Sequence, residues 1–366
     1  MSCRRLRVQL GDRGTPRDAL VRLEAVEVVQ EMDAMWEARL RISTELDRGG
    51  RWRHRLDEIV QPFTRIRVDV EMDDALVPLI DGPVTGFETA LDSQPGQSEG
   101  TLIVRDDSVF LHRQEGVEIF ENQRDSDIAE GIFRQAPEIR SFLIDPTDQV
   151  HRAAVRRGTP MQFLRQLARA NNRRAFVLPG PRRGESIGCF LADPEEPADL
   201  PELRLIGRAR SLADVSIKED FETPETTIAQ VLRIGDQKIV AAETKLSELV
   251  LMNDRLHVND ALAATRLLMP ADNTREDARP SVETQSRRNS YAIRLSSRVV
   301  PNAYPAVLTP YRKVPIVLSQ TPYSGAYLIT RVVHRISRSQ YTQEFDAETD
   351  SLTEVSAAPG ATGAIF

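Results

Sequence analysis

The sequence is poor in residue types that mark several classes of protein. Its 366 residues include only two cysteines, Cys3 and Cys189, and aromatic residues make up 5%. A disulfide framework needs more cysteines than this, so the pair fits a reducing compartment or indifference to redox conditions. The few aromatic side chains argue against a carbohydrate-binding adhesin, because sugars stack on aromatic platforms.

Long apolar runs and basic tracts are missing as well. No segment approaches the ~18 apolar residues of a membrane span, so we expect no membrane anchor. The N-terminal segment 1–7 is charged and no apolar stretch follows it, which argues against a signal peptide. The net charge is -7 without a basic patch, so no nucleic-acid binding is expected. These features predict a protein made and assembled in the cytoplasm.

Alternation of apolar and polar residues dominates the first and last parts of the chain. Segments 36–43 and 65–72 alternate strictly. Period two is typical of a strand with one buried face in an antiparallel sheet. Further strands are expected around 26–28 and in 101–104, 228–234, 327–336 and 341–347, the last two forming a hairpin across 337–340.

The middle of the chain reads as mixed α/β structure. A helix is expected to begin at Asp125, whose acidic neighbourhood suits a helix N-terminus. Thr159 and Pro160 are a fitting N-cap and first residue for a second helix, 159–171. Segments 174–178 and 189–191 suggest a hairpin around the loop 179–188. A third helix is expected at 259–268, and 270–290 reads as a polar linker.

One motif suggests a catalytic serine. Residues 184–188, Gly-Glu-Ser-Ile-Gly, match G-x-S-x-G, in which a strand precedes the serine and a helix follows it. Here a segment with prolines and glycine precedes Ser186 and an apolar, strand-like run follows. We therefore interpret the motif as part of a hairpin loop.

Histidines and acidic pairs give no stronger signal. None of the five histidines has a partner at metal-ligand spacing: His54, His112, His151, His257 and His334. His334 shares a strand face with apolar neighbours and is expected to be half-buried and satisfied, and His112 to be a solvated or interface residue. The pairs Asp73-Asp74 and Asp106-Asp107 could serve glycoside hydrolysis, but adjacent acids at strand ends usually occupy turns. We assign no catalytic, cofactor-binding or metal-binding residue, and no cofactor.

Three patterns, in order along the chain, resemble one family. The first runs through 106–108, 111–113, 120–122 and 125–129; the second is 159–168, with its Phe-Leu and Leu-Ala pairs; the third joins 325–329, 333–336 and 341–345. They are similar to the late control protein D and tail-hub family of contractile phages. The same module forms the N-terminal part of the VgrG spike protein and occurs in extracellular contractile injection systems. The resemblance covers most of the chain.

The resemblance implies a β-rich α+β fold with two tube-forming antiparallel β-barrel domains and α/β and helical inserts. The expected parts are a first barrel at 1–115, an α/β insert at 116–205, a second barrel at 206–245 and 291–352, a helical insert with polar linker at 246–290, and a C-terminal tail at 353–366. The polar strand faces fit either a tube lumen or ordinary solvent, since period two is the same in both cases.

The resemblance also implies a structural role rather than an enzymatic one. A homotrimeric baseplate hub would join the hexameric inner tube to the trimeric spike and seed tube assembly. Expected partners are the inner tail tube protein, a spike protein, baseplate wedge proteins and a tape-measure or cargo protein, within a virion or an extracellular phage-tail-like particle. The spike is expected to be a separate polypeptide, because the sequence stops before the OB-fold and β-helix of spike proteins. The alternative is an effector or cell-wall hydrolase delivered by such a system, for which Ser186 is the candidate nucleophile.

Overall fold

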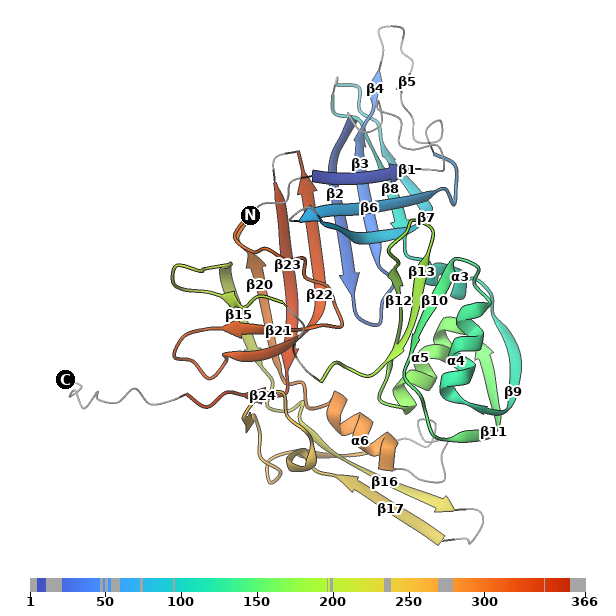
Figure 1. Ribbon diagram of the computed structural model, residues 1–366, viewed down its shortest axis with the longest axis vertical. Coiled ribbons are helices and arrows are strands. Elements are labelled where there is room, and N and C mark those ends of the chain that lie inside the picture. Colours follow the sequence, from blue (N-terminus) through green and yellow to red (C-terminus); the bar gives the residue numbers. More distant parts are fainter. Residues whose placement is uncertain are drawn as a thin grey trace, which may run out of the picture.

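The computed structural model describes residues 5–10, 22–46, 49, 52–53, 60–72, 75–94, 96–195, 197, 200–233, 238–268, 279–338 and 340–355. Within these residues strands greatly outnumber helices (Figure 1). The expected β-rich α+β class is confirmed. None of the described helices is long and apolar enough to cross a membrane.

The N-terminal part is an antiparallel set of strands. In β2, Val26 and Val28 are buried while their neighbours reach solvent, as period two predicts. The strands expected around 26–28 and in 36–43, 65–72 and 101–104 are confirmed. The elements are β1 (Arg5–Leu10), β2 (Leu23–Glu31), β3 (Glu37–Ser43), β4 (Glu45–Leu46), β5 (Trp52–Arg53), β6 (Arg65–Met72), β7 (Ala75–Ala90) and β8 (Glu99–Arg105).

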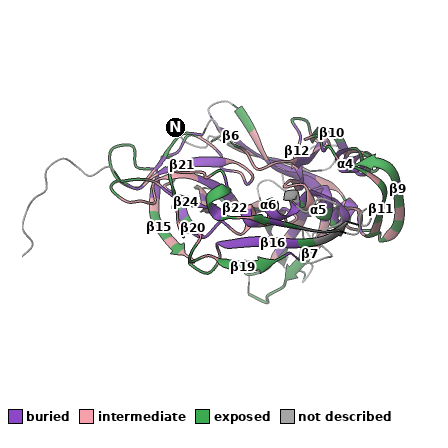
Figure 2. Ribbon diagram, turned by 90° about the horizontal axis from the view of Figure 1, so that it is seen from below, coloured by how far each residue is buried: buried purple, intermediate pink, exposed green. Residues whose placement is uncertain are grey.

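The middle part folds around its own core. The two expected helices and the expected hairpin are confirmed as α4, α5 and β12–β13. Its elements are α3 (Ser108–Leu111), β9 (Gly116–Arg124), α4 (Asp125–Arg134), β10 (Ile139–Ile144), β11 (Val150–Gly158), α5 (Pro160–Ala170), β12 (Arg174–Pro179) and β13 (Ser186–Leu191). The β9–β11 ribbon lies at the outer side of this part, and Figure 2 shows β9 largely exposed.

Local chemistry explains where α5 begins. The Thr159 hydroxyl accepts a hydrogen bond from the Gln162 backbone N–H (3.2 Å), and the Gln162 side chain accepts one from the Thr159 N–H (3.0 Å). This capping box satisfies two amides that a helix start leaves free. The apolar face of α5, which includes Phe163, then packs into the core beside Phe133. A side chain at Gly188 would meet the Phe133 ring at 2.6 Å, so glycine permits this close approach of β13 to α4.

The C-terminal part returns to strands that are antiparallel except for the short β14–β21 pair, and the expected hairpin across 337–340 is confirmed. Tyr327 and Phe345 lie in its core. The elements are β14 (Leu203–Arg204), β15 (Leu212–Glu219), β20 (Ile293–Val299), β21 (Lys313–Val317), β22 (Gly325–Ser337), β23 (Tyr341–Thr349) and β24 (Ser351–Leu352).

Between β15 and β20 the chain forms a small unit of its own. It consists of β16 (Glu225–Arg233), β17 (Lys238–Thr244), the 3-10 turn η1 (Leu246–Glu248), β18 (Arg255–Leu256), β19 (Ala264–Leu267) and α6 (Arg279–Arg288). The strand expected at 228–234 is confirmed as β16. Figure 1 shows the β16–β17 hairpin reaching away from the long sheet with α6 beside it.

Two expectations in this unit are wrong. The helix expected at 259–268 is a turn followed by β19, which pairs in parallel with β16 from Glu225↔Ala264 to Ile228↔Leu267. The polar stretch expected to be a linker contains α6, held by the buried Val282 and by Ser286, whose hydroxyl donates to the Thr244 carbonyl (3.1 Å). Contacts with residues distant in the sequence determine the structure of both segments. The local sequence patterns of the two segments do not indicate those contacts.

The two sets of strands join into one long sheet. Its order is β1-β6-β7-β8-β3-β2-β22-β23-β20-β15, with β21 and β14 attached beside β22. β2 pairs with β22 in antiparallel register from Ala25↔Ser337 to Glu31↔Arg331. We call this pairing the seam. Closure of either half into a barrel and the expected domain boundaries stay predictions.

The two halves of the sheet have the same strand order. In the first half the chain order of the strands is β2, β3, β6, β7, β8, and their order in the sheet is β6-β7-β8-β3-β2. In the second half, β15, β20, β21, β22, β23 lie in the order β21-β22-β23-β20-β15. The fold is therefore an internal structural repeat whose halves meet at the seam.

Candidate functional site

Ser186, the serine of the G-x-S-x-G motif, is the first residue of β13. A strand follows it, and the preceding turn contains Gly184 at φ +78°, so the hairpin interpretation is confirmed. Its hydroxyl donates to Asp107 (2.7 Å), and both side chains are buried. A catalytic triad places a histidine between serine and acid. Here the Asp107 carboxylate accepts the serine hydroxyl directly, so the pair lacks the intervening histidine of a triad.

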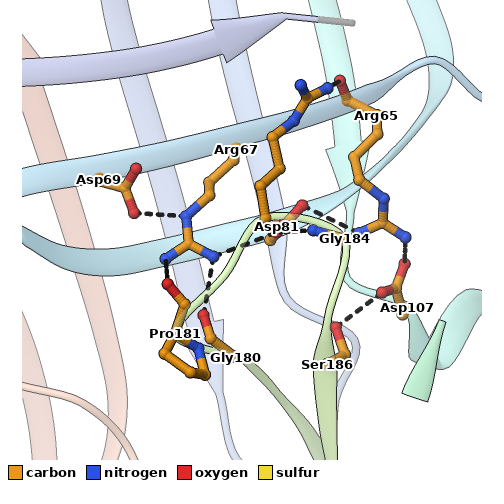
Figure 3. A network of polar contacts seen from close by, with 10 residues as sticks. Arg65, Arg67, Asp69, Asp81, Asp107, Gly180, Pro181, Gly184 and Ser186 are labelled. Atoms are coloured by element: carbon orange, nitrogen blue, oxygen red, sulfur yellow. Dashed lines mark hydrogen bonds and ion pairs between the residues drawn. The ribbon is translucent and has the colours of Figure 1, made fainter. Parts of the chain in front are cut away.

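Ser186 belongs to a buried polar network between β6–β8 and the 180–186 loop (Figure 3). We call it the hairpin network. Arg65 pairs with Asp81 (3.0 Å) and Asp107 (2.8 Å). Arg67 pairs with Asp69 (2.7 Å) and Asp81 (3.3 Å). Buried charges need such partners, because an unpaired one costs several kcal/mol.

The hairpin network reaches the loop through its backbone. Arg67 donates to the carbonyl of Gly180 (2.8 Å), and Asp81 accepts from the N–H of Gly184 (2.8 Å). Burial raises the pKa of Asp107, although its ion pair with Arg65 opposes the shift. The arrangement fixes the middle part against the N-terminal strands, which is an architectural task.

Sequence reasoning missed the hairpin network apart from Ser186 and the Asp106-Asp107 pair. Apart from Arg67–Asp69, the partners lie far apart in the chain, by 14 residues for Arg67–Asp81 and by 113 for Arg67–Gly180. One signal was available, since Arg65, Arg67 and Asp69 alternate with apolar residues and so share a strand face. The alternation predicts a wet polar face, whereas β6 is buried on both faces.

The adjacent acids Asp106 and Asp107 lie in the turn after β8, as expected, but both are buried. Asp106 accepts from the backbone N–H of Trp36 (2.5 Å) and of Ser108 (2.8 Å). Burial raises the pKa of Asp106 to about 6. These carboxylates are occupied by backbone and arginine partners, which removes them as a glycosidase pair. Asp73-Asp74 lies outside the described residues.

The described histidines lie in separate environments. His151 lies 2.9 Å from Asp125 in a groove of 910 Å³ between α5, β11 and α6, and His257 lies 3.7 Å from Glu219. His112 is partly buried, and burial lowers its pKa. Across the described parts of the chain, no three His, Cys, Asp or Glu side chains gather as a metal site requires. His54 lies outside the described residues.

His334 is fully buried at the seam rather than half-buried. One ring nitrogen lies 3.2 Å from the Gln30 amide oxygen of β2, and the other lies 2.9 Å from the Tyr341 hydroxyl. The Gln30 amide donates onward to the Leu79 carbonyl (2.8 Å). Burial lowers the pKa of His334 to about 3, so the ring is neutral at ordinary pH. The expectation of a satisfied histidine is confirmed, and its partners lie on both sides of the seam.

The polar side of the sheet carries paired charges across the seam. Arg335 of β22 contacts Glu27 of β2 (2.8 Å) and Glu344 of β23, and Arg331 lies 3.7 Å from Glu31. We call the side that bears these residues the charged face. Exposed pairs contribute little to stability, about 0–1 kcal/mol each. Their effect is to alternate positive and negative groups over a surface that spans both halves.

Comparison with solved structures shows the same fold in phage tail proteins. The tail protein from Neisseria meningitidis MC58 aligns with 94% of this chain and 96% of its own, with a TM-score of 0.65 and 11% identity. The 43 kDa tail protein of prophage MuSo2 from Shewanella oneidensis aligns with 95% of this chain and 99% of its own, with a TM-score of 0.67 and 11% identity.

A third structure comes from Escherichia coli. It is a type VI secretion component described as similar to the T4 bacteriophage tail proteins gp27 and gp5; it aligns with 94% of this chain and 76% of its own, with a TM-score of 0.59 and 14% identity. No protein-family model matches the chain, and no curated protein matches its sequence. At these identities the likeness establishes the fold.

Proposed function

We propose that the chain is a structural baseplate hub subunit of the late control protein D type, in a contractile phage tail or a phage-tail-like injection system. One observation carries the proposal. Two β units with the same strand order are joined edge to edge in a chain that has the fold of phage tail proteins along almost its whole length.

The internal repeat suits a protein that lies between a hexameric assembly and a trimeric one. A homotrimer of two-unit chains presents six similar units to a hexameric inner tube and three copies to a trimeric spike. We propose that residues 1–115 and 206–245 with 291–352 provide these units, and that 116–205 and 246–290 are inserts. The force would come from sheath contraction elsewhere, and the hub would transmit it through obligate interfaces, which bury roughly 2,000 Å² or more.

The proposed role is not enzymatic. The alternative, a delivered effector or cell-wall hydrolase, relied on Ser186, and its direct bond to Asp107 inside the hairpin network gives it a structural task. The proposed partners are the inner tube protein, a spike protein, baseplate wedge proteins and a tape-measure or cargo protein.

The test is purification of the tagged chain from its native host, with negative-stain imaging and mass spectrometry of the co-purifying proteins. We expect rod-shaped particles with sheath, tube and spike proteins and three copies of this chain in each. A lone protein from cells that do make such particles would overturn the proposal.

A further inference from the structure

We propose that the groove between α5, β11 and α6 binds an extended, acidic segment of a partner protein, which adds to the unpaired edge of β11 as a further strand. The groove lies between the middle part of the chain and the small unit that contains α6. It uses neither the seam nor the hairpin network, so the inference does not depend on the hub role.

The size and lining of the groove suit a peptide. Its volume of 910 Å³ lies within the range of ligand sites, which is about 300–1,000 Å³. Phe163 and Leu167 of α5 and Leu268 contribute buried apolar side chains to the lining. Figure 1 and Figure 2 both show α5 between β11 and α6, so α5 forms the base of the groove and the other two elements form its sides.

One side of the groove is a strand edge. Within the described part of the chain, β11 pairs with β9 in a two-stranded sheet and its other edge has no strand partner. Ala153, Ala154 and Val155 all line the groove, although neighbouring side chains of a strand point to opposite faces. The groove therefore runs along the edge of β11, where backbone N–H and C=O groups are available to an added strand.

The opposite side is a polar helix face. Four lining residues lie at positions i, i+3, i+4 and i+7 and so share one side of α6: Ser281, Thr284, Gln285 and Arg288. Ser281 and Thr284 are only 5% and 3% exposed. The buried Ser281 hydroxyl has no hydrogen-bond partner among the described residues. An unsatisfied buried hydroxyl is costly, and a peptide in the groove would supply its partner.

Two glutamines offer groups that match a peptide backbone. Gln166 of α5 and Gln285 of α6 line the groove from different helices. A primary amide both donates and accepts hydrogen bonds, as a peptide group does. Such side chains can bind a backbone whatever its sequence, so the charge and the apolar pattern of the segment decide which segment binds.

The charges that line the groove favour an acidic segment. Arg169 and Arg288 are both lining residues. Asp125 is the one acid among the described residues that line the groove, and its carboxylate is already engaged. It accepts a hydrogen bond from the Asn171 side chain (2.7 Å) and lies 2.9 Å from His151. The arginines are therefore left to attract carboxylates from outside the chain.

Arg288 shows this excess of positive charge most clearly. Its guanidinium donates to the Arg173 carbonyl (2.9 Å), while its buried Nε has no hydrogen-bond partner in the described part of the chain. Burial, and next the charge of Arg174, lower the pKa of Arg288 to about 10. Asp33 and Asp193 oppose this shift, but both pair with Arg174. A carboxylate in the groove would supply the counter-charge.

The lining also defines the pattern of the segment. Alternate side chains of an added strand point to opposite sides. Apolar side chains on one side would contact Phe163 and Leu167, and acidic side chains on the other would lie within reach of Arg169 and Arg288. The segment expected in the groove therefore alternates apolar and acidic residues.

The first test uses the purified full chain and two fluorescein-labelled peptides of about ten residues, a length typical of strand addition. Valine and glutamate alternate in the first peptide, and lysine replaces glutamate in the second. Fluorescence polarisation should show at least ~10-fold tighter binding of the acidic peptide, because its charge complements the arginines. Equal affinities, or no binding of the acidic peptide at millimolar concentration, would overturn the inference and leave the hub proposal standing.

Arginine variants locate the binding site. Arg288→Gln should weaken binding of the acidic peptide about tenfold or more, because it removes a charge-assisted hydrogen bond. Arg169→Gln repeats the measurement at an exposed side chain, where folding is not at risk, and should weaken binding by about threefold. Arg298→Gln is the matched control, since Arg298 lies on β20 and does not line the groove. Affinities of the Arg288 and Arg169 variants equal to that of the control would contradict the assignment.

Hydrogen exchange distinguishes strand addition from attraction by charge alone. An added strand bonds to backbone N–H groups of β11, so exchange in 150–158 should slow when the acidic peptide is present. Exchange in β20, residues 293–299, should not change. Binding without protection of β11 would show that the peptide contacts the helices only, and would refute the pairing.

A photoreactive benzophenone residue in place of Gln166 identifies the occupant in the native host. We expect crosslinks to a segment of another protein that is rich in acidic residues, and their loss when Arg169→Gln is added. Crosslinks within the chain, to a second copy of it or to a basic segment would overturn the inference. Absence of the chain from tail-like particles would overturn the hub proposal alone.

Discussion

Phe63 and Tyr311 occupy equivalent positions in the two halves of the fold, and both have a left-handed backbone, with φ of 63° and 64°. Bulky residues rarely adopt this conformation. Tyr311 stacks on Phe176 with ring centroids 3.6 Å apart, whereas Phe63 lies under the Arg113 guanidinium at 4.5 Å. The same turn therefore serves an internal contact in one half and carries a half-exposed ring in the other.

Tyr327 tests the core of the second half. Its ring is fully buried and its hydroxyl donates to the Tyr323 carbonyl (2.9 Å). Tyr327→Asp should cost more than about 4 kcal/mol and abolish assembly, because it removes the ring and buries a carboxylate. Tyr327→Phe should cost about 1 kcal/mol. Urea unfolding measures both changes, and normal particles from the Asp variant would show that this core is misplaced.

Arg67 tests whether the hairpin network holds the 180–186 loop. Arg67→Ala removes the ion pair of the buried Asp69 and one of the two arginines that contact Asp81, and should cost about 3–5 kcal/mol. The Gly184 N–H donates a hydrogen bond to Asp81, and its hydrogen-exchange rate should rise in this variant. The control is Arg298→Ala, whose ion pair with Asp214 is exposed and should contribute little to stability. Equal effects of the two variants would contradict the structural role of the network.

Ser186 separates the structural from the catalytic interpretation. Ser186→Ala removes one hydrogen bond to Asp107 and should lower the unfolding free energy by about 1–3 kcal/mol. Assembly of particles should be unchanged. The measurement pairs urea unfolding with a cell-wall hydrolysis assay on the unmodified chain. Hydrolysis that disappears in the alanine variant would restore the effector alternative.

The seam should weaken in acid because His334 stays neutral when folded. Its pKa falls to about 3 in the structure, while an unfolded histidine titrates near 6.5. Below pH 6.5 the unfolded state binds the extra proton, so stability is lost as the pH falls toward 3. At pH 5 the loss from this group should be about 2 kcal/mol. Comparison of unfolding at pH 7.5 and 5 in wild type and His334→Gln checks it; equal pH slopes would contradict the assignment.

Sequence patterns correctly predicted the helices and strands that form for local reasons. Thr159 and Pro160 marked the start of α5, and alternation marked β3, β6 and β22. The failures depend on distant partners. β19 is a strand because β16 lies beside it, and Asp107 is buried because Arg65 and Ser186 meet it from other strands. The seam itself joins residues about three hundred positions apart, as in His334–Gln30, and no local pattern indicates it.

The long strand β7 belongs to two layers at once. Its first part, to Pro83, pairs with β6, and from Val84 onward it pairs with β8. In the other half β22 does the same, with β21 and then β23. A pull that tries to separate the layers therefore acts along a continuous covalent backbone. Covalent bonds withstand far more tension than side-chain contacts do. Each half is therefore held together by unbroken backbone at the place where its long strand changes partner.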